Sequence, residues 1–298
     1  MFYKVEQLTD AVKRNIKDAL FEDLGSGDLS ARFIADKKVE AHVLLKSECA
    51  VLCGTSWFEN TFRFVDKATQ VKWEKTDGLK IFQNELICVL KGSAKSILAA
   101  ERVSLNFLQT LSATATETHN YMERIKEVKE KKCLILDTRK TLPGLRLAQK
   151  YAVRVGGGSN QRFGLWDSVL LKENHLISLG GFTSLIRRYG NAASAAEVEK
   201  INLDHFQIEV ENMHEYSLAT AFGAKQILLD NFSITDLKKA VSLNMNEAIL
   251  EASGNISLLN IRDIVMTGVD RVSIGGLTKN LNAIDFTLRF KSASSRLR

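Results

Sequence analysis

The sequence predicts an α/β protein with a parallel sheet in its C-terminal part, and two observations lead to this prediction. First, short apolar segments recur from residue 133 onward, and each contains or ends on a polar residue: CLILD (133–137), SVLLK (168–172), FQIEV (206–210), QILLD (226–230), AILEAS (248–253) and RVSIGG (271–276). Second, amphipathic stretches fill the gaps between them. Continuous apolar strands that alternate with helices are typical of parallel sheets.

The polar residues at these strand ends favour a barrel. In α/β barrels the active site lies at the carboxyl ends of the strands, and every strand can contribute to it. A doubly wound open sheet is the competing architecture, but it would concentrate ligand groups at one switch point. One of the connecting helices is expected over residues 233–243, where Ser233 and Asp236 resemble a capping box.

The first 110 residues follow a different pattern, typical of an α+β domain. Helical periodicity over residues 5–20 is followed by an acidic turn at residues 22–28. Alternating strands are expected at residues 41–45, 71–73 and 85–90, and one long helix is expected over residues 93–128. We therefore expect an N-terminal domain over residues 1–110 and a catalytic barrel domain over residues 111–298, with the C-terminal tail able to pack back on the first. The last residues, KSASSRLR, are expected to fray.

The composition narrows the class of function. A net charge of +6 and a pI near 9.0 suit nucleic acid or phosphorylated metabolites equally well. No block of five or six Lys and Arg residues exists, and the densest stretch, Lys126 to Lys132, alternates with Glu. This argues against nucleic acid as a partner, and an RNA-binding protein ranks far behind an enzyme because no RNA-binding motif is recognisable.

The remaining composition points to a cytoplasmic enzyme. The four cysteines form no CxxC pair and adjoin no histidine cluster, so zinc and redox sites are not expected: Cys49, Cys53, Cys88 and Cys133. The first residues, MFYKVEQLTDAVKRNI, are too charged for a signal peptide, and no apolar run approaches the length of a membrane span.

The stretch from Asp137 to His175 has the composition of a site for a small anionic ligand. It contains the only proline of the chain, Pro143, a triple glycine at 156–158, and seven cations: Arg139, Lys140, Arg146, Lys150, Arg154, Arg162 and Lys172. Glycines let backbone amides approach a ligand closely. A solvated basic surface is the alternative, but it does not explain the apolar strands on either side.

Several motifs together resemble the quinolinate phosphoribosyltransferase family. They occur in order along the chain: EDLGSGD (22–28), ERVSLNFLQTLSATAT (101–116), DTRKTLPGLR (137–146), AVRVGGGSNQRFGLWDSVLLKENH (152–175), IEVEN (208–212), ILLDNFS (227–233), LEASGNI (250–256) and VSIGGLT (272–278). The resemblance implies an N-terminal α/β sandwich domain followed by an open or incomplete α/β barrel. It also implies a homodimer with the active site shared across the interface, or a higher oligomer.

The reaction implied is the transfer of a phosphoribosyl group from phosphoribosyl pyrophosphate to quinolinate, with decarboxylation and with Mg²⁺. The products are nicotinate mononucleotide, pyrophosphate and carbon dioxide, a step of NAD biosynthesis. Charge builds on the pyrophosphate leaving group and on an oxocarbenium-like ribose. Such a site therefore needs cations for the phosphates and carboxylates near the sugar.

The resemblance also implies roles for individual residues. The catalytic residues would be Lys140, Glu209 and Asp230, the last two also holding ribose hydroxyls and the metal. The pyridine substrate would be bound by Arg102 of the neighbouring subunit and by Arg139, Gln161, Arg162 and Lys172. Forked guanidinium groups suit its two carboxylates. Phosphoribosyl pyrophosphate would be bound by Lys140, Lys172, Ser253, Gly254, Asn255, Gly275, Gly276 and Lys279.

Each role has a plainer alternative. Arg102 suits a helix surface near Glu101, and on spacing alone this is the better interpretation. Glu209 and Asp230 suit ordinary strand-end or capping acids, and Lys172 suits a snorkelling side chain. His175 is interpreted as structural, orienting the Lys172 loop.

The chain departs from the family pattern at four positions. The family has histidine at Gln161, and tends to have glutamate at Gln207, glycine at Asn255 and histidine at Lys279. Gln207 is expected off the face that carries Glu209, and Asn255 tolerates a positive φ. Gln161 replaces a group able to carry positive charge by a neutral one, which suits a carboxamide as well as a carboxylate. A non-decarboxylating enzyme that uses nicotinamide or nicotinate is therefore the alternative, although the retained cations favour quinolinate.

Overall fold

The computed structural model describes residues 5–128, 133–189, 206–245 and 248–291, and the expected frayed tail lies outside these residues except for Lys291. The chain divides into two compact units, each assembled from separate segments. The first unit combines residues 1–119, 141–157 and 277–298, and the second combines residues 120–140 and 158–276.

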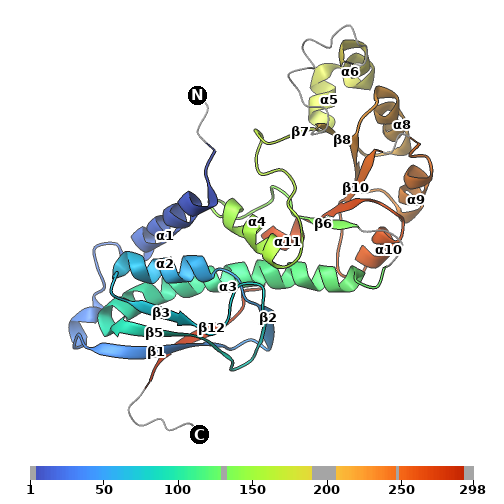
Figure 1. Ribbon diagram of the computed structural model, residues 1–298. Helices are drawn as coiled ribbons and strands as arrows, with labels where there is room; N and C mark the ends of the chain where they lie inside the picture. Colours follow the sequence, from blue (N-terminus) through green and yellow to red (C-terminus); the bar gives the residue numbers. More distant parts are fainter. Residues whose placement is uncertain (1–4, 129–132, 190–205, 246–247, 292–298) are drawn as a thin grey trace. The chain divides into compact units, whose positions relative to one another are not determined.

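The first unit contains a four-stranded antiparallel sheet in the order β12-β1-β5-β3 (Figure 1). These strands span Phe286–Phe290, Lys38–Leu45, Leu86–Ser93 and Gln70–Trp73. A second small sheet pairs β2 (Cys49–Val51) with β4 (Lys80–Phe82). The strands expected at 41–45, 71–73 and 85–90 are confirmed as parts of β1, β3 and β5.

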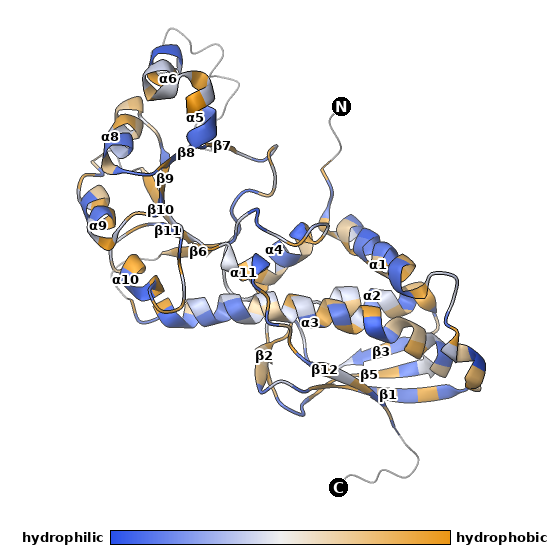
Figure 2. Cartoon of the chain, turned by 180° about the vertical axis from the view of Figure 1, so that it is seen from behind, coloured by the Kyte–Doolittle hydropathy of each residue, from blue (hydrophilic) through white to orange (hydrophobic). Residues whose placement is uncertain are grey.

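Helices account for the rest of this unit: α1 (Leu8–Leu24), the 3-10 helix η1 (Ser30–Phe33), α2 (Thr55–Val65), most of α3 (Ala94–Ile125) and α4 (Arg146–Val155). A short helix, α11 (Gly276–Lys279), begins at the last residue of the second unit. The two helices expected from periodicity are confirmed as α1 and α3. Hydrophilic and hydrophobic segments alternate along both helices (Figure 2).

The core of the first unit follows from strand alternation and helix periodicity. On β1 every second residue, Ala41, Val43 and Leu45, is fully buried against the aromatic side chains of α2. A second cluster joins α1 to α2, α3 and α4 through Val12, Ile16, Leu20, Trp57, Phe107, Leu111, Ala148 and Ala152. These apolar stripes fix the helices, since the N-cap residues of α1 and α2 themselves make no side-chain capping bond.

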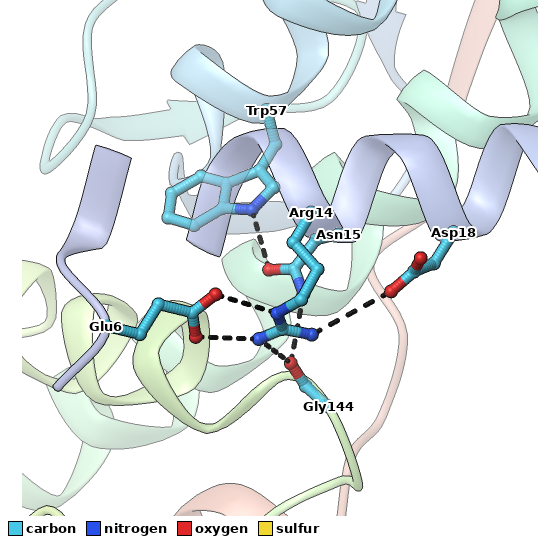
Figure 3. A network of polar contacts seen from close by, with 6 residues as sticks. All are labelled: Glu6, Arg14, Asn15, Asp18, Trp57 and Gly144. Atoms are coloured by element: carbon cyan, nitrogen blue, oxygen red, sulfur yellow. Dashed lines mark hydrogen bonds and ion pairs between the residues drawn. The ribbon is translucent and has the colours of Figure 1, made fainter. Parts of the chain in front are cut away.

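A buried amide on α1 completes the packing of this unit (Figure 3). Asn15 is 5% exposed; its Nδ2 donates to the carbonyl of Gly144 and its Oδ1 accepts from Trp57 Nε1. Arg14 donates to the same carbonyl and to both carboxylate oxygens of Glu6. The turn at Pro143–Gly144, where Gly144 has φ +78°, is thereby tied to α1.

The second unit is a six-stranded parallel sheet in the order β6-β11-β10-β9-β8-β7 (Figure 1). The strands span Leu134–Leu136, Arg271–Ser273, Ile249–Ser253, Gln226–Asp230, Phe206–Val210 and Val169–Leu171. All six strands expected from the sequence are confirmed. The strands from β7 to β11 follow one another in chain order, and β6 then pairs with β11. Because this order never reverses in the middle, the sheet is an incomplete barrel, as expected, and not a doubly wound sheet.

Within the described residues of this unit, five helices follow the strands: α5 (Glu173–Leu179), α6 (Gly181–Tyr189), α8 (Met213–Phe222), α9 (Ile234–Ser242) and α10 (Ile261–Val265). Ser233 begins α9 as expected, since its hydroxyl accepts from the backbone N–H of Asp236 at 3.1 Å. Among the residues described, no helix combines the length and the apolar character that a membrane crossing requires.

Candidate active site

The sheet of the second unit has one apolar and one polar face. Residues paired in register on parallel strands point to the same side, and the side alternates along each strand. One face therefore carries the buried residues Ile208, Val210, Ile227, Leu229, Leu250, Ala252 and Val272. The other carries Gln207, Glu209, Asp230, Glu251, Ser253 and Ser273. The expectation that Gln207 lies off the face of Glu209 was wrong, because two residues apart on a strand means the same face.

Lys172 and Glu209 form an ion pair on this face. The Nζ of Lys172 lies 2.5 Å from Glu209 Oε2, and the carboxylate is largely buried while the lysine side chain is about half exposed. The backbone N–H of Lys172 donates to His175 Nδ1 at 3.1 Å. His175 thus orients the start of α5, in agreement with its structural interpretation.

Two guanidinium groups, Arg139 and Arg162, lie near each other, and Arg162 is within electrostatic range of Glu209. Burial lowers the pKa of Arg162, and the positive charge of Arg139 lowers it further, while Glu209 and Asp167 oppose both effects. Arg162 Nη1 donates to the carbonyl of Ser168 at 3.0 Å, but its buried Nε–H has no hydrogen-bond partner among the described residues. Like charges held together with an unsatisfied donor are the arrangement expected where an anion binds.

Gln161 precedes this arginine and is held through both its backbone and its side chain. Its backbone N–H donates to Asp137 Oδ1 at 3.0 Å, and Asn160 donates to the other oxygen of the same buried carboxylate at 2.6 Å. The Gln161 side chain donates to Gln207 Oε1 at 3.2 Å. The cationic segment is thus attached to the polar face of the sheet.

Asp230 and Ser253 end adjacent strands, and a loop of unusual backbone conformation follows them. Asn231, Gly254 and Asn255 all have positive φ (56°, 93° and 50°). A Cβ at Gly254 would lie 2.1 Å from Asn231 Oδ1, so the loop admits only glycine there. The positive φ at Asn255 agrees with the expected tolerance of asparagine for this conformation.

Asn231 is the residue that sequence reasoning missed here. Its side-chain Nδ2 donates to Asp230 Oδ2 at 2.9 Å, its Oδ1 accepts from Asn255 Nδ2 at 3.0 Å, and its backbone N–H donates to the carbonyl of Ser253 at 2.8 Å. It joins the carboxylate of one strand end to the glycine loop of the next. Its sequence signal was an asparagine immediately after a strand-ending aspartate, since asparagine adopts positive φ readily.

Lys140 meets the end of β11. The lysine stem passes over Gly275, where an added Cβ would lie 3.0 Å from Lys140 Cδ. Thr138 Oγ1 accepts from the backbone N–H of Lys140 at 3.0 Å and holds the turn that carries it. Glycine suits position 275 because a larger residue would crowd the Lys140 side chain. Gly276 follows as the first residue of α11.

The second unit thus brings together most of the predicted residues: Arg139, Lys140, Gln161, Arg162, Lys172, Glu209, Asp230, Ser253, Gly254, Asn255, Gly275 and Gly276. Arg102 and Lys279 belong to the first unit, where both are exposed, on α3 and α11 respectively. The cationic stretch is also divided. Arg146, Lys150 and Arg154 lie on α4 of the first unit, and Lys150 is fully buried there.

One glycine of the triple run is explained by packing. A Cβ at Gly156 would lie 2.4 Å from the carbonyl oxygen of Ala115 and 2.7 Å from Thr118 Cβ. Helix α4 therefore ends in direct contact with α3, and the close approach at Gly156 is between two helices instead of between the backbone and a ligand.

Carboxylates gather at the ends of β8 and β9. Burial raises the pKa of Glu211, and the charges of Glu173, Glu215, Asp230 and Glu209 raise it further. Within the described part of the chain, however, no three His, Cys, Asp or Glu side chains are grouped as a metal site. The donors available are carboxylate oxygens, the type that a hard divalent cation prefers.

Comparison with known proteins identifies the family. Residues 114–289 match the family described as Quinolinate phosphoribosyl transferase, C-terminal domain, and residues 18–112 match its N-terminal domain. A Bacillus subtilis protein named "Probable nicotinate-nucleotide pyrophosphorylase [carboxylating]" is 33% identical, covering 93% of this chain and 92% of the relative. The Arabidopsis thaliana chloroplastic nicotinate-nucleotide pyrophosphorylase [carboxylating] is 35% identical, covering 93% and 82%.

The fold agrees with these matches. The solved nicotinate-nucleotide pyrophosphorylase from Francisella tularensis superimposes with a TM-score of 0.86 at 40% identity, covering 96% of this chain and 98% of that one. Both domains of one family match in order along the chain. The second unit also contains most of the cations and carboxylates that were expected at the site. The chain belongs to the quinolinate phosphoribosyl transferase family.

Proposed function

We propose that this protein transfers the phosphoribosyl group of phosphoribosyl pyrophosphate to quinolinate and releases pyrophosphate and carbon dioxide. The product is nicotinate mononucleotide. The observation that carries this proposal is the pair Arg139 and Arg162, two guanidinium groups near each other, with a buried Arg162 Nε–H that lacks a partner among the described residues. A ligand with two carboxylates supplies the acceptor that the Arg162 Nε–H lacks and offsets the repulsion between the arginines.

The remaining residues suit the phosphoribosyl donor. The bond from C1′ to the pyrophosphate oxygen breaks as C1′ bonds to the ring nitrogen. Negative charge therefore moves to the pyrophosphate, where Lys140 and Lys172 stabilise it. Glu209 and Asp230, on one face of adjacent strands, hold the ribose hydroxyls and stabilise its developing positive charge. The 5′-phosphate binds at the loops containing Ser253, Gly254, Asn255, Gly275 and Gly276.

Mg²⁺ fits this site as an ion shared with the substrate. Magnesium in such sites is held by one or two carboxylates together with substrate phosphates, rather than by a protein cage. Glu209 and Asp230 provide that number of carboxylates, in an acidic region marked by the raised pKa of Glu211. When bound, the ion neutralises charge on the pyrophosphate leaving group.

We also propose a homodimer, or a higher oligomer built from it, in which Arg102 completes the pyridine site of the neighbouring subunit. Arg102 is exposed on α3, and the first unit exposes several large apolar side chains near the end of α1: Phe21 at 83%, Leu29 at 66% and Phe33 at 91%. Exposed apolar groups of this size are typical of interfaces. The four cysteines are free, which supports our proposal of a cytoplasmic location.

Nicotinamide is not favoured as the substrate. The names of the relatives refer to carboxylating pyrophosphorylases, and the amide nitrogen of Gln161, which motivated the alternative, is already donating to Gln207. A neutral ring would also bring no negative charge to offset the repulsion between Arg139 and Arg162.

The test is to offer quinolinate, nicotinate and nicotinamide separately, each with phosphoribosyl pyrophosphate and Mg²⁺, and to identify the nucleotide by mass. We expect nicotinate mononucleotide and carbon dioxide from quinolinate, with little product from the other two. Turnover of nicotinamide in preference to quinolinate would overturn the proposed substrate. Chelation of Mg²⁺ should abolish the reaction, and full activity without a divalent ion would refute the role of the metal.

A further inference from the structure

Three polar side chains form a hydrogen-bonded line within the second unit. Glu251 Oε2 accepts from Gln207 Nε2 at 2.9 Å, and Gln207 Oε1 accepts from Gln161 Nε2 at 3.2 Å. Glu251 is 1% exposed and Gln207 is 5% exposed. The line thus runs from the interior of the polar sheet face to Gln161, which immediately precedes Arg162, a partly buried arginine.

Glu251, at the buried end of the line, sets which group donates and which accepts in each of these hydrogen bonds. A carboxylate oxygen accepts hydrogen bonds, so Gln207 turns its NH₂ group toward Glu251. Its carbonyl oxygen must then face Gln161, and Gln161 in turn directs its NH₂ group toward Gln207. The orientation of one amide thereby fixes that of the next.

The backbone of Gln161 is fixed independently of this line. Its N–H donates to Asp137, whose other oxygen accepts from Asn160, and Ser159 is bridged to Leu136 of β6. With the backbone held, the remaining freedom of Gln161 is the rotation of its side chain. The contact with Gln207 restricts that rotation.

Glu251 is an unfavourable residue for the fold alone. Burial raises the pKa of its carboxyl group, and the charge of Asp137 raises it further; hydrogen bonds from Gln207 and Ser273 and the charge of Arg271 oppose the shift without cancelling it. Burying a carboxyl group is costly even when it is hydrogen-bonded, and an apolar side chain of similar size would avoid that cost.

We propose that Glu251 is a positioning residue for pyridine binding, which acts through Gln207 to hold the Gln161 side chain in one orientation beside Arg162. The inference rests on the proposed function and on the pyridine-binding role that the family resemblance implies for Gln161. Glu251 itself does not touch the substrate. Its effect passes through two hydrogen bonds.

The test is a double-mutant cycle on quinolinate binding. The Kd for quinolinate is measured by calorimetry for the wild type, Glu251→Gln, Gln161→Ala and the double variant. Gln at 251 can either donate to or accept from Gln207, so both amide orientations become available. We expect Glu251→Gln to weaken binding about 3- to 10-fold in the wild-type background, the worth of one hydrogen bond. In the Gln161→Ala background we expect a change below about twofold, because nothing remains to be oriented.

Two further variants make the cycle decisive. Gln207→Met interrupts the line without touching either end, and it should show the same dependence on Gln161. Asp270→Asn neutralises a carboxylate that precedes β11 and accepts from the backbone of Leu250, and it should leave the Kd unchanged. Thermal unfolding of each variant confirms that it folds.

The outcomes separate the two proposals. Equal weakening by Glu251→Gln in both backgrounds, or no weakening in either, would overturn the positioning role while leaving the proposed function intact. A wild-type protein that neither binds nor converts quinolinate would instead overturn the proposed function, and this inference with it.

Discussion

Glu209 and Asp230 present carboxylates from neighbouring strands, each with a partner already in place. Lys172 pairs with Glu209, and Asn231 donates to Asp230. These contacts hold both groups in position before substrate arrives. Preorganised charge of this kind is typically the largest single contribution to rate.

We expect Glu209→Ala and Asp230→Ala each to lower kcat/KM by about 10²–10³, the loss typical of one preorganised electrostatic group. Steady-state kinetics with quinolinate would measure it, with circular dichroism to verify folding. Asp263→Ala, which removes an exposed carboxylate in the first turn of α10, is the matched control and should be fully active. Near-normal turnover in either site variant would remove that residue from the mechanism.

The buried carboxyl group of Glu251 predicts a pH-dependent stability. Its pKa is raised in the folded protein above the ordinary value of 4.5. Its stabilising contribution is therefore complete below that ordinary value and is lost as the pH rises through the folded pKa. Glu251→Gln cannot ionise, so its stability relative to the wild type should increase as the pH rises from about 4.5 toward neutrality. Urea unfolding of both proteins across this range would measure the difference, and a difference independent of pH would refute the assignment.

Sequence reasoning located the charged residues of the site and not the contacts between them. Arginines, lysines and carboxylates near predicted strand ends can be recognised as candidate site residues from the sequence alone, because a charged group at such a position requires a partner. Gln161 and Gln207, two departures from the family pattern, are 46 residues apart and were considered separately, yet they are hydrogen-bonded to each other. Their pairing depends on the register of β8 and on the path of the chain after Gly158, which no local pattern specifies.

At the scale of elements, Asn15 is the clearest case of a helix fixed by a single polar side chain. It bonds the indole N–H of Trp57 on α2 and the carbonyl of Gly144 (Figure 3). We expect Asn15→Ala to lower the free energy of unfolding by about 1–3 kcal/mol, the cost of leaving the buried indole N–H of Trp57 unpaired, while the carbonyl of Gly144 keeps its bond from Arg14. Asn60→Ala, which removes an exposed asparagine on α2 bonded only within its own helix, should change it by less than about 0.5 kcal/mol.

Urea denaturation would measure both changes. Asn15→Asp keeps the acceptor for Trp57 and loses the donor to Gly144, so it should fall between the wild type and Asn15→Ala. A loss no larger than that of Asn60→Ala would show that the network adds little to the packing of α1.

The elements that the sequence did not predict are short or atypical. Strands β2 and β4 have three residues each, too few for a period to be detected. Helix α2 begins after Gly54, which has φ +104°, and its N-terminus is capped by Asp77 from a distant turn. Helices α1 and α3 were predicted because they are long and periodic. The six parallel strands were predicted because each lies in an apolar run of a kind that recurs along the chain, although three of them have only three residues.

At the scale of the whole molecule, the proposed dimer predicts complementation between inactive proteins. Arg102→Ala and Lys172→Ala should each be nearly inactive alone, because each removes a cation from the site. After subunit exchange, a mixed dimer would contain one site with both native residues, and up to about a quarter of the wild-type activity should return.

Activity of the mixture, followed with time after mixing, would measure the recovery, and labelled subunits would verify exchange. Recovery should be absent when Lys172→Ala is mixed with Glu209→Ala, since both residues belong to the same unit and would come from the same subunit. No recovery after verified exchange would argue that Arg102 does not act across an interface.

For the whole molecule, the domain boundary expected near residue 110 stays a prediction. The compact units do not follow one another along the chain, since the first also includes α4 and β12. Composition and periodicity describe neighbours in sequence, and they carry no information on which distant segment returns to which sheet.

The return of β12 to β1 has a consequence for the order of events during synthesis. Lys291 donates to Glu40, which the ribosome delivers 251 residues earlier. Until Phe286–Phe290 emerges, β1 has a bare hydrogen-bonding edge, and a nascent chain with such an edge is open to pairing with its neighbours on the same message. The first sheet to be translated is thus among the last to be closed.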